Sequence, residues 1–132
     1  MEILSTTFEE VKLIVPDVYS DERGFFFESH NTERFAEHGL EQTFVQDNVS
    51  SSCRGVLRGM HFQAENCQGK LVQVLHGRIF DVAVDIRPNS LTFGRWFGTE
   101  LSADNQHQLF IPVGFAHGFV SLDETNVVMY KC

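Results

Sequence analysis

The stretch GVLRGMHFQ, residues 55–63, combines apolar strand-forming residues with two groups that can do chemistry. Arg58 carries a fixed positive charge suited to binding anions, and His61 carries an imidazole, the side chain that exchanges protons near neutral pH. A strand that served only a hydrophobic core would contain neither group. A second imidazole, His117, lies in PVGFAHGF, where strand alternation places it on the same face as two phenylalanines. By itself, that setting favours a hydrogen-bonded core histidine.

The whole chain limits the classes of function. Its 132 residues correspond to one domain, 1–132, and a 42% hydrophobic content allows a single core. The net charge of −8, without a basic stripe, argues against nucleic-acid binding. No apolar run is long enough to span a membrane, and the acidic, polar start MEILSTTFEE is unlike a signal peptide. We therefore expect a cytoplasmic protein with no nucleic-acid or membrane partner.

Most of the chain is strand-like and is broken by turn residues about every ten positions. Alternation of apolar and other residues is clearest over 79–86. One helix is expected over 31–39, with Asn31 or Thr32 as its N-cap and Gly39 just past its end. This pattern predicts an antiparallel β-sandwich or barrel. Further strands are expected over 11–16, 21–29, 43–50, 95–102, 108–122 with a turn at 112–114, and 126–132.

Two partial motifs lie within these strands. Gly55, five further residues and His61 follow the first cupin motif, G-x5-H-x-H, up to its second histidine. Pro112, Gly114 and His117 follow the second motif, P-x-G-x-x-H. Their order and separation resemble the cupin jelly roll, a double-sheet barrel with a ligand cavity inside. The resemblance implies an all-β, cupin-type antiparallel jelly roll with one short helix.

The sequence departs from the cupin pattern where a metal would bind. Gln63 stands in place of the second histidine, and the expected glutamate position falls at Cys67 or Gln68. No C-x-x-C pair offers a zinc site either. We therefore expect no metal and no cofactor, which argues against a metal-dependent cupin oxygenase. The residues expected in the cavity suit an acid–base site for an anionic substrate: Arg58, His61, Lys70 and His117.

Longer segments resemble one family across the chain, from about Phe8 to Lys131. DERGFFFES, FVQDN, VLRGMHFQ, QGKLVQVLHGRIFDVAVDIRPNS, TFGRW, LSADN and IPVGFAHGF are similar to the dTDP-4-dehydrorhamnose 3,5-epimerases. The resemblance implies conversion of dTDP-4-dehydro-6-deoxy-D-glucose to dTDP-4-dehydro-L-rhamnose, in dTDP-rhamnose biosynthesis, by proton abstraction at C3 and C5. Because the C4 ketone acidifies both positions, the reaction needs a base, a group that stabilises the enolate oxygen, and an acid.

The resemblance assigns one residue to each of these three tasks. His61 matches the base of the family. Lys70 in QGKL matches the cation beside the enolate oxygen, and Tyr130 in MYK matches the acid, a phenol that is neutral at pH 7 and can donate a proton. Considered alone, Lys70 is typical of a solvated turn and Tyr130 of core packing.

The same resemblance assigns the substrate contacts. Arg23 and Arg58 match positions that hold the diphosphate, and His117 matches a sugar contact. Without the family, Arg58 fits a surface ion pair equally well, and Arg23 fits a solvated turn. In the family, the 21–29 segment is exchanged between the subunits of a homodimer, so that two chains build each site. The remaining matches are neighbouring polar contacts, Gln46 and Asn48, and contacts to the thymine, Phe26 and Glu28.

Strand phase sets a condition on this assignment. Strict alternation places Arg58 and His61 on opposite faces, whereas the family needs both in one cavity. We therefore expect a β-bulge at Gly59, since bulges often carry glycine and often lie beside active sites. Asp81 and Asp85 share a strand face; we interpret Asp81 as structural and Asp85 as an exposed charge beside a turn. No role is expected for the histidines in turns or beside the helix, His30, His38, His76 and His107.

The resemblance also implies a difference at the end of the chain. Members of the family continue past the position of Cys132 by several strands, which carry an aspartate paired with the catalytic histidine and an aromatic that stacks on thymine. We therefore expect a jelly roll that lacks the last strands of the family. Two alternatives follow: an epimerase that acts at C3 or C5 only, and a catalytically impaired fragment that binds sugar nucleotides.

Overall fold

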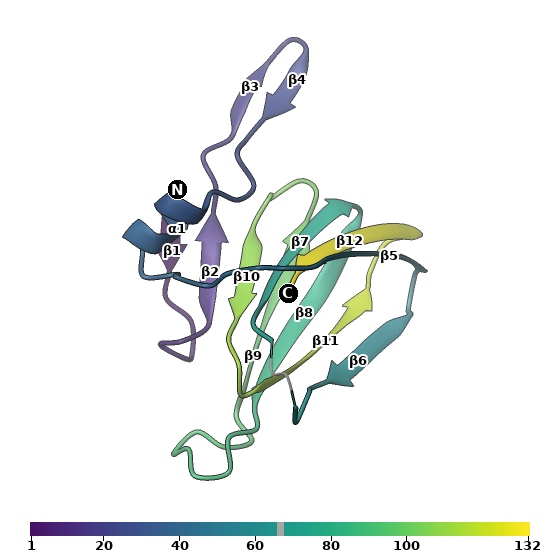
Figure 1. Cartoon of the computed structure of the whole chain (residues 1–132). Coiled ribbons are helices and arrows are strands. Elements are labelled where there is room, and N and C mark those ends of the chain that lie inside the picture. The colour runs from purple at the N-terminus through teal and green to yellow at the C-terminus, as the bar shows by residue number, and fades with distance from the viewer. Residues whose placement is uncertain (66–67) are drawn as a thin grey trace.

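A computed structural model of the protein describes residues 1–65 and 68–132, which form twelve strands and one helix (Figure 1). All strand pairs are antiparallel, as the sequence predicts. The six-stranded sheet has the order β1 (Glu2–Leu4), β2 (Lys12–Val15), β10 (Gln108–Ile111), β7 (Lys70–His76), β12 (Thr125–Lys131) and β5 (Asp47–Cys53). The four-stranded sheet has the order β6 (Leu57–His61), β11 (Phe115–Ser121), β8 (Arg78–Asp85) and β9 (Trp96–Ser102).

The core lies between these two sheets. Alternation along each strand sends every second side chain inward, and the inward residues form one buried apolar cluster. The six-stranded sheet contributes Val72, Val74, Leu109, Ile111 and Val128, and the four-stranded sheet contributes Ile79, Ala83, Leu101, Phe115 and Phe119. The sandwich predicted from strand spacing is thus confirmed, and the inner faces of the two sheets define the space in which the chemistry-bearing residues must lie.

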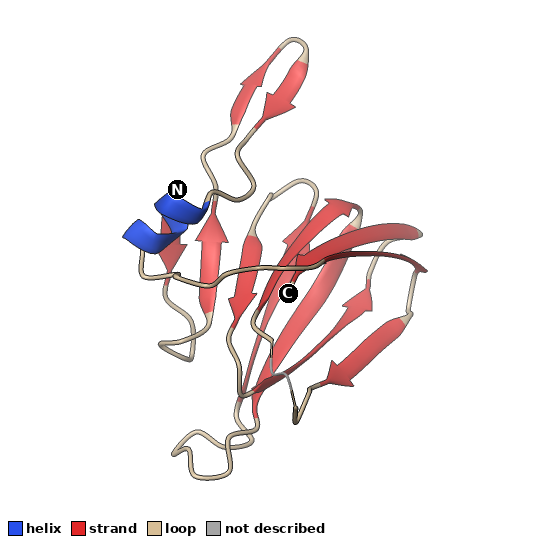
Figure 2. Ribbon diagram, viewed as in Figure 1, coloured by secondary structure: helices blue, strands red, loops and turns tan. Residues whose placement is uncertain are grey.

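A second, smaller core covers the opposite face of the six-stranded sheet. Helix α1 (Thr32–Glu37) begins at Asn31, whose side chain accepts hydrogen bonds from two backbone amides of the first turn. The helix ends before Gly39, where φ is +75°, so the expected helix and both its end signals are confirmed (Figure 2). Phe35 of the helix packs with Ile14, Leu40, Leu71 and Phe110.

Strand β8 contradicts one expectation from the sequence. Asp85 is fully buried, although we expected an exposed charge. Arg87 donates to both of its carboxylate oxygens, each at 2.9 Å, and the hydroxyls of Ser90 and Thr92 donate at 2.6 and 2.5 Å. These donors compensate the loss of water around the carboxylate. They hold the pKa of Asp85 well below its ordinary value of 3.8, chiefly through Arg87.

Two further strand boundaries differ from expectation. Residues 43–46 form no strand, and β5 begins only at Asp47. Instead, Val45 N–H donates to the carbonyl of Cys132, and the N–H of Cys132 donates to the carbonyl of Gln46. The expected aromatic strand over 21–29 is confined to a short hairpin made of β3 (Tyr19–Asp21) and β4 (Gly24–Phe26). Cys67, one of the two positions considered for a metal-binding glutamate, lies outside the described residues.

The β3–β4 hairpin projects away from both sheets (Figure 1). Its aromatic side chains Tyr19, Phe25 and Phe26 are exposed, and only the segment after it returns to the body of the protein. There, the side-chain amide of Gln108 donates to the carbonyl of Ser29 at 2.8 Å. In the described part of the chain, no helix has the length and apolar character needed to cross a membrane.

Candidate active site

Strand β6 contains the bulge that the sequence predicts. His61 lies opposite His117 in the register with β11, and Arg58 lies opposite Phe119. The two pairs are separated by two positions on β11 but by three on β6, so β6 holds one extra residue between them. Because His117 and Phe119 both face the interior, Arg58 and His61 share that inner face.

A glycine at position 59 lets β6 approach the backbone of β11 closely. Its φ is +116°, in a region that residues with a side chain rarely adopt. A Cβ atom at this position would lie 2.6 Å from the Gly118 Cα and 2.7 Å from the His117 carbonyl oxygen. The backbone of β11 therefore fills the space that any side chain at position 59 would need.

Arg58 joins the edges of the two sheets, since β6 ends one sheet and β5 ends the other. Its Nε donates to the Ser52 hydroxyl at 2.8 Å, and its Nη2 donates to the Ser51 carbonyl at 3.2 Å. Both partners are neutral, and within the described residues no carboxylate forms an ion pair with Arg58. The alternative of a surface ion pair is therefore wrong, and the positive charge is available to an anion.

Two other candidates face the interior from the six-stranded sheet. Tyr130 lies opposite Val72 in the register and packs against the central core. Lys70 starts β7 two residues before Val72, so it points to the same side. Its positive charge acts on the nearby thiol of Cys132. Burial raises the pKa of that thiol, and the charge of Lys70 opposes the rise. Both Tyr130 and Lys70 are partly buried. Lys70 is therefore not a freely solvated turn residue, and Tyr130 is not enclosed in the core.

Asn48 and Gln46 lie where β5 begins. Asn48 faces Tyr130 across the β5–β12 pair. Its oxygen accepts a hydrogen bond from the Gln46 side-chain amide at 2.9 Å, and its own amide lies 3.6 Å from the Cys132 sulfur. These two side chains therefore extend the polar lining from Tyr130 toward the outer edge of the sheet.

His117 has a buried carboxylate partner. Its Nε2 lies 2.7 Å from the Asp81 Oδ1, and the two residues are only 5% and 0% exposed. The expectation of a hydrogen-bonded histidine is confirmed at this position. His61 is different, because it is exposed on the edge strand and, within the described residues, no carboxylate hydrogen-bonds to it. Asp81 and Asp85, the acids nearest to it in strand order, are bonded to His117 and Arg87.

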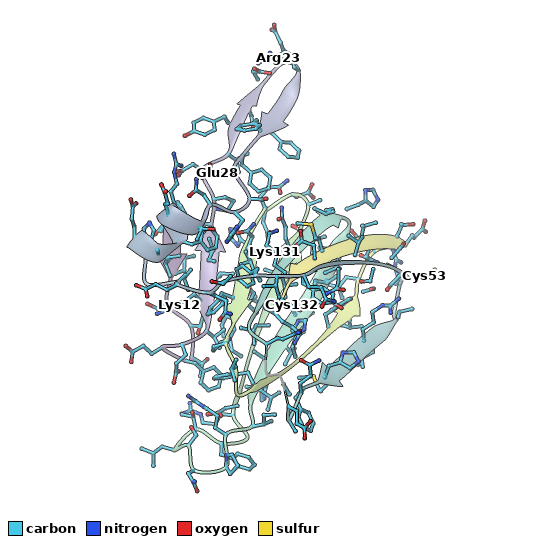
Figure 3. The ribbon with its side chains drawn as sticks, in the orientation of Figure 1. Lys12, Arg23, Glu28, Cys53, Lys131 and Cys132 are labelled. Carbon is cyan, nitrogen blue, oxygen red and sulfur yellow. The ribbon has the colours of Figure 1, made fainter. Side chains whose placement is uncertain are left out.

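The hairpin residues are not brought to the inner faces. Arg23 lies at the hairpin tip, where its guanidinium binds Asp21 with a shortest N–O distance of 2.6 Å (Figure 3). Phe26 is 72% exposed on β4. Glu28 lies at the hairpin base, within 3.4 Å of Arg34 and 3.2 Å of the Asn31 amide. Within a single chain, these three residues therefore lie apart from His61, Lys70 and Tyr130.

Sequence reasoning missed the part that Ser52 plays. Its hydroxyl orients Arg58, yet a serine within NVSSSC carries no distinguishing signal. The contact depends on the two edge strands lying side by side, which no local pattern encodes. For a metal, the described residues provide no group of three or more histidine, cysteine, aspartate or glutamate side chains.

Comparison with known proteins agrees with these features. The profile of the family "dTDP-4-dehydrorhamnose 3,5-epimerase" matches residues 5–132. The enzyme of that name from Methanothermobacter thermautotrophicus is 56% identical over 129 residues, which cover 98% of this chain and 70% of that protein. Its counterpart from Salmonella typhimurium is 56% identical over 133 residues, covering 99% and 73%.

Solved structures show the same relationship in three dimensions. The crystal structure of dTDP-6-deoxy-D-glucose-3,5-epimerase from Legionella pneumophila, in complex with dTDP-4-keto-L-rhamnose, superimposes with a TM-score of 0.97 at 53% identity. The match covers 99% of this chain and 70% of that one. The fold and the resemblance inferred from sequence are both confirmed: this chain belongs to the dTDP-4-dehydrorhamnose 3,5-epimerase family.

Proposed function

We propose that this chain inverts C3 and C5 of dTDP-4-dehydro-6-deoxy-D-glucose, giving dTDP-4-dehydro-L-rhamnose. The observation that carries the proposal is the position of His61 and Tyr130 on opposing sheets. Both face the space between the sheets, His61 from the four-stranded sheet and Tyr130 from the six-stranded one. Inversion requires that a proton leave one face of a carbon and return to the other, and this arrangement supplies one group for each face.

Each catalytic role follows from the chemistry of the group. The His61 imidazole removes the proton next to the ketone, because it can accept a proton at neutral pH. Lys70, a cation set in a partly buried position, stabilises the charge that develops on the enolate oxygen. The Tyr130 phenol then donates a proton from the other side.

The diphosphate is assigned to the open edge between β5 and β6. Arg58 presents an uncompensated guanidinium there, held by Ser52 and the Ser51 carbonyl. Guanidinium groups bind phosphate oxygens through paired, charge-assisted hydrogen bonds. The amides of Gln46 and Asn48, at the other end of β5, add neutral polar contacts beside Tyr130. His117 is assigned to the sugar, because it lies opposite the base.

The hairpin indicates how the site is completed. We propose a homodimer in which the 21–29 segment of each subunit reaches its partner, so that Arg23 meets the diphosphate and Phe26 and Glu28 meet the thymine. The support is that the hairpin leaves its own sheets and exposes aromatic side chains. Light scattering should then give twice the chain mass, and deletion of residues 21–26 should weaken dTDP binding. We also propose that the protein works in the cytoplasm, where its free thiols stay reduced.

Solvent exchange tests the reaction directly. The protein is incubated with the substrate in deuterium oxide, and label at C3 and at C5 is read by NMR. We expect label at both carbons, whereas His61→Ala should reduce exchange by about 10²–10⁴-fold with dTDP affinity nearly unchanged. His76→Ala, at the exposed end of β7, is the matched control and should exchange as the unmodified protein does.

Two other outcomes would replace the proposal. Label at one carbon alone would identify an epimerase specific for C3 or C5. Binding of dTDP without any exchange would identify a sugar-nucleotide-binding protein. One observation favours that second candidate: in the described residues no carboxylate orients the imidazole of His61. An orienting carboxylate of this kind can contribute several orders of magnitude to a rate.

A further inference from the structure

We propose that Asp81 is a positioning residue that fixes the tautomer of His117, so that His117 binds a sugar hydroxyl and rejects the ketone. The inference rests on the proposed epimerase function, which it deepens by assigning how the sugar is oriented. Neither the sequence nor the family resemblance gave Asp81 more than a structural role. The contact between His117 and Asp81, on neighbouring strands β11 and β8, is the starting point.

The hydrogen bond determines which nitrogen carries the hydrogen. An ionised carboxylate can only accept hydrogen bonds, so the 2.7 Å contact requires a hydrogen on the His117 Nε2. The other carboxylate oxygen, Asp81 Oδ2, is buried and has no hydrogen-bond partner in the described structure. The imidazole is thus the one described group that holds this carboxylate, and an unpaired carboxylate there would be costly.

The second nitrogen of the ring remains for the substrate. Within the described residues, His117 Nδ1 makes no hydrogen bond, and it is not among the buried atoms that lack one. His117 lies directly opposite His61 across β6 and β11, and residues opposite each other in an antiparallel pair have Cβ atoms about 5 Å apart. A sugar that presents its proton to His61 therefore lies within reach of His117.

The fixed tautomer gives the site a way to tell two sugar oxygens apart. In the neutral ring, Nδ1 offers a lone pair, which accepts a hydrogen bond from a hydroxyl. A ketone oxygen is also only an acceptor, so it is repelled by Nδ1 and attracted by the Lys70 ammonium, which is only a donor. The two residues face the interior from opposite sheets. Together they favour the orientation in which the ketone meets Lys70.

Two variants separate this role from simple packing. Asp81→Leu removes the acceptor at nearly constant size, and Asp81→Asn replaces one oxygen with a donor, which favours a hydrogen on Nδ1. Ser121→Ala is the matched control, because this buried hydroxyl lies on the same inner face and has no partner in the described structure. Tautomers are read from the ¹⁵N shifts of histidine-labelled protein, with His117→Gln used to assign the signal.

We expect the unmodified protein to show His117 with its hydrogen on Nε2, and both Asp81 variants to lose that preference. We further expect kcat to fall at least tenfold in both variants and KM to fall with it, because substrate bound the wrong way round occupies the site without reacting. Ser121→Ala should keep kcat and KM within about threefold of the unmodified values. If Asp81→Leu does not fold, the Asp81→Asn variant carries both measurements.

Three results would overturn the inference: a hydrogen on Nδ1 in the unmodified protein, a kcat within threefold of the Ser121→Ala value, or a lower kcat with unchanged KM. The last result would mean fewer correctly folded sites, hence packing alone. Failure of the proposed function is distinguishable, because the unmodified protein would then exchange deuterium at one carbon only or at neither. With exchange at one carbon, the same kinetic tests apply. With no exchange, binding of the dTDP-sugar decides: the inference holds if it shifts Nδ1 in the unmodified protein but not in Asp81→Leu, and fails otherwise.

Discussion

Arg58 on β6 donates its Nε hydrogen to the Ser52 hydroxyl on β5 at 2.8 Å, and so ties together the open edges of the two sheets. The bond holds the guanidinium plane, and within the described residues the opposite edge of the guanidinium makes no hydrogen bond. A second bond, from Nη2 to the Ser51 carbonyl, fixes the same orientation. Because both partners are neutral, the full positive charge is left for an anion. The relationship explains why an arginine, and not merely a cation, occupies this position.

Replacing Arg58 by lysine tests that explanation. Arg58→Lys keeps the charge but loses the fork, so dTDP should bind about tenfold more weakly by isothermal titration, which corresponds to about 1.4 kcal/mol. Arg54→Lys is the matched control, since Arg54 is exposed in the turn just before β6. Unchanged affinity in Arg58→Lys would show that the position acts through charge alone, and an equal loss in both variants would show that the effect is not specific to Arg58.

The bulge at Gly59 gives a second prediction. Gly59→Ala should lower the free energy of unfolding by about 3 kcal/mol or more, because it combines backbone strain with overpacking against β11. Urea unfolding measures the change. Gly55→Ala is the control. Gly55 also has a positive φ, +79°, but outside its chain neighbours no atom lies within 4 Å of the point that a Cβ atom would occupy. Backbone strain alone should therefore lower the free energy of unfolding of this variant by about 1–2 kcal/mol.

Gly59→Ala should also affect the reaction in molecules that remain folded. The bulge is what turns His61 and Arg58 to one face, so a shift of β6 displaces the base relative to the diphosphate site. Deuterium exchange per folded molecule should therefore fall at least tenfold, while Gly55→Ala should leave it unchanged. Normal exchange in a destabilised Gly59→Ala protein would mean that the bulge serves the fold and not the site.

The buried carboxylate of Asp85 predicts how acid affects stability. Its pKa is lowered in the folded state, mainly by Arg87, so the stabilisation is fully present above 3.8 and is lost as pH falls below that value. Asp85→Asn should cost about 2–4 kcal/mol at pH 7 and flatten the dependence of stability on pH between about 4 and 2. Urea unfolding at several pH values measures both effects.

Asp123→Asn is the comparison for this prediction. Asp123 binds Arg78 at 3.2 Å on the surface, with both side chains at least 40% exposed. An exposed ion pair of this kind contributes less than about 1 kcal/mol. A loss from Asp123→Asn as large as that from Asp85→Asn would mean that burial of Asp85 is not the source of its effect.

His30 predicts a second pH dependence, in a milder range. Its ring packs between Phe35 and Phe44, with centroid distances of 4.8 and 5.3 Å, and its Nε2 is buried without a partner in the described structure. Burial lowers the pKa of His30 below 6.5, and the charge of Lys131 adds to the effect. The unfolded chain therefore takes up the proton first, and stability should decline as pH falls below about 6.5.

Substitution of His30 isolates this contribution. His30→Phe keeps an aromatic ring in the cluster and removes the titrating group, so thermal unfolding should depend less on pH between about 7 and 5. His38→Gln, at the exposed end of α1, should leave the dependence as it is in the unmodified protein. An unchanged pH profile in His30→Phe would show that other groups set acid sensitivity in this range.

Local patterns were sufficient for much of the fold. Alternation over 79–86 predicts β8 to within one residue, and Asn31 and Gly39 delimit α1 as expected. These signals succeed because burial on one face and unsatisfied backbone groups at a helix end act on residues close in the chain. The strand expected over 43–50 was misplaced because the backbone there bonds to Cys132, far away in sequence.

The sequence by itself determined the family, the antiparallel sandwich and the identity of the chemical groups, because long motifs and strand alternation are local properties. It also predicted the bulge at Gly59, because strict alternation conflicts with the chemistry. Only the tertiary structure decided which groups meet: Asp81 with His117, Asp85 with Arg87, and Arg58 with Ser52. The Asp81–His117 and Arg58–Ser52 pairs depend on how separate strands pack together, which no local pattern encodes, whereas the Asp85–Arg87 pair depends on how the turn after β8 folds Arg87 back.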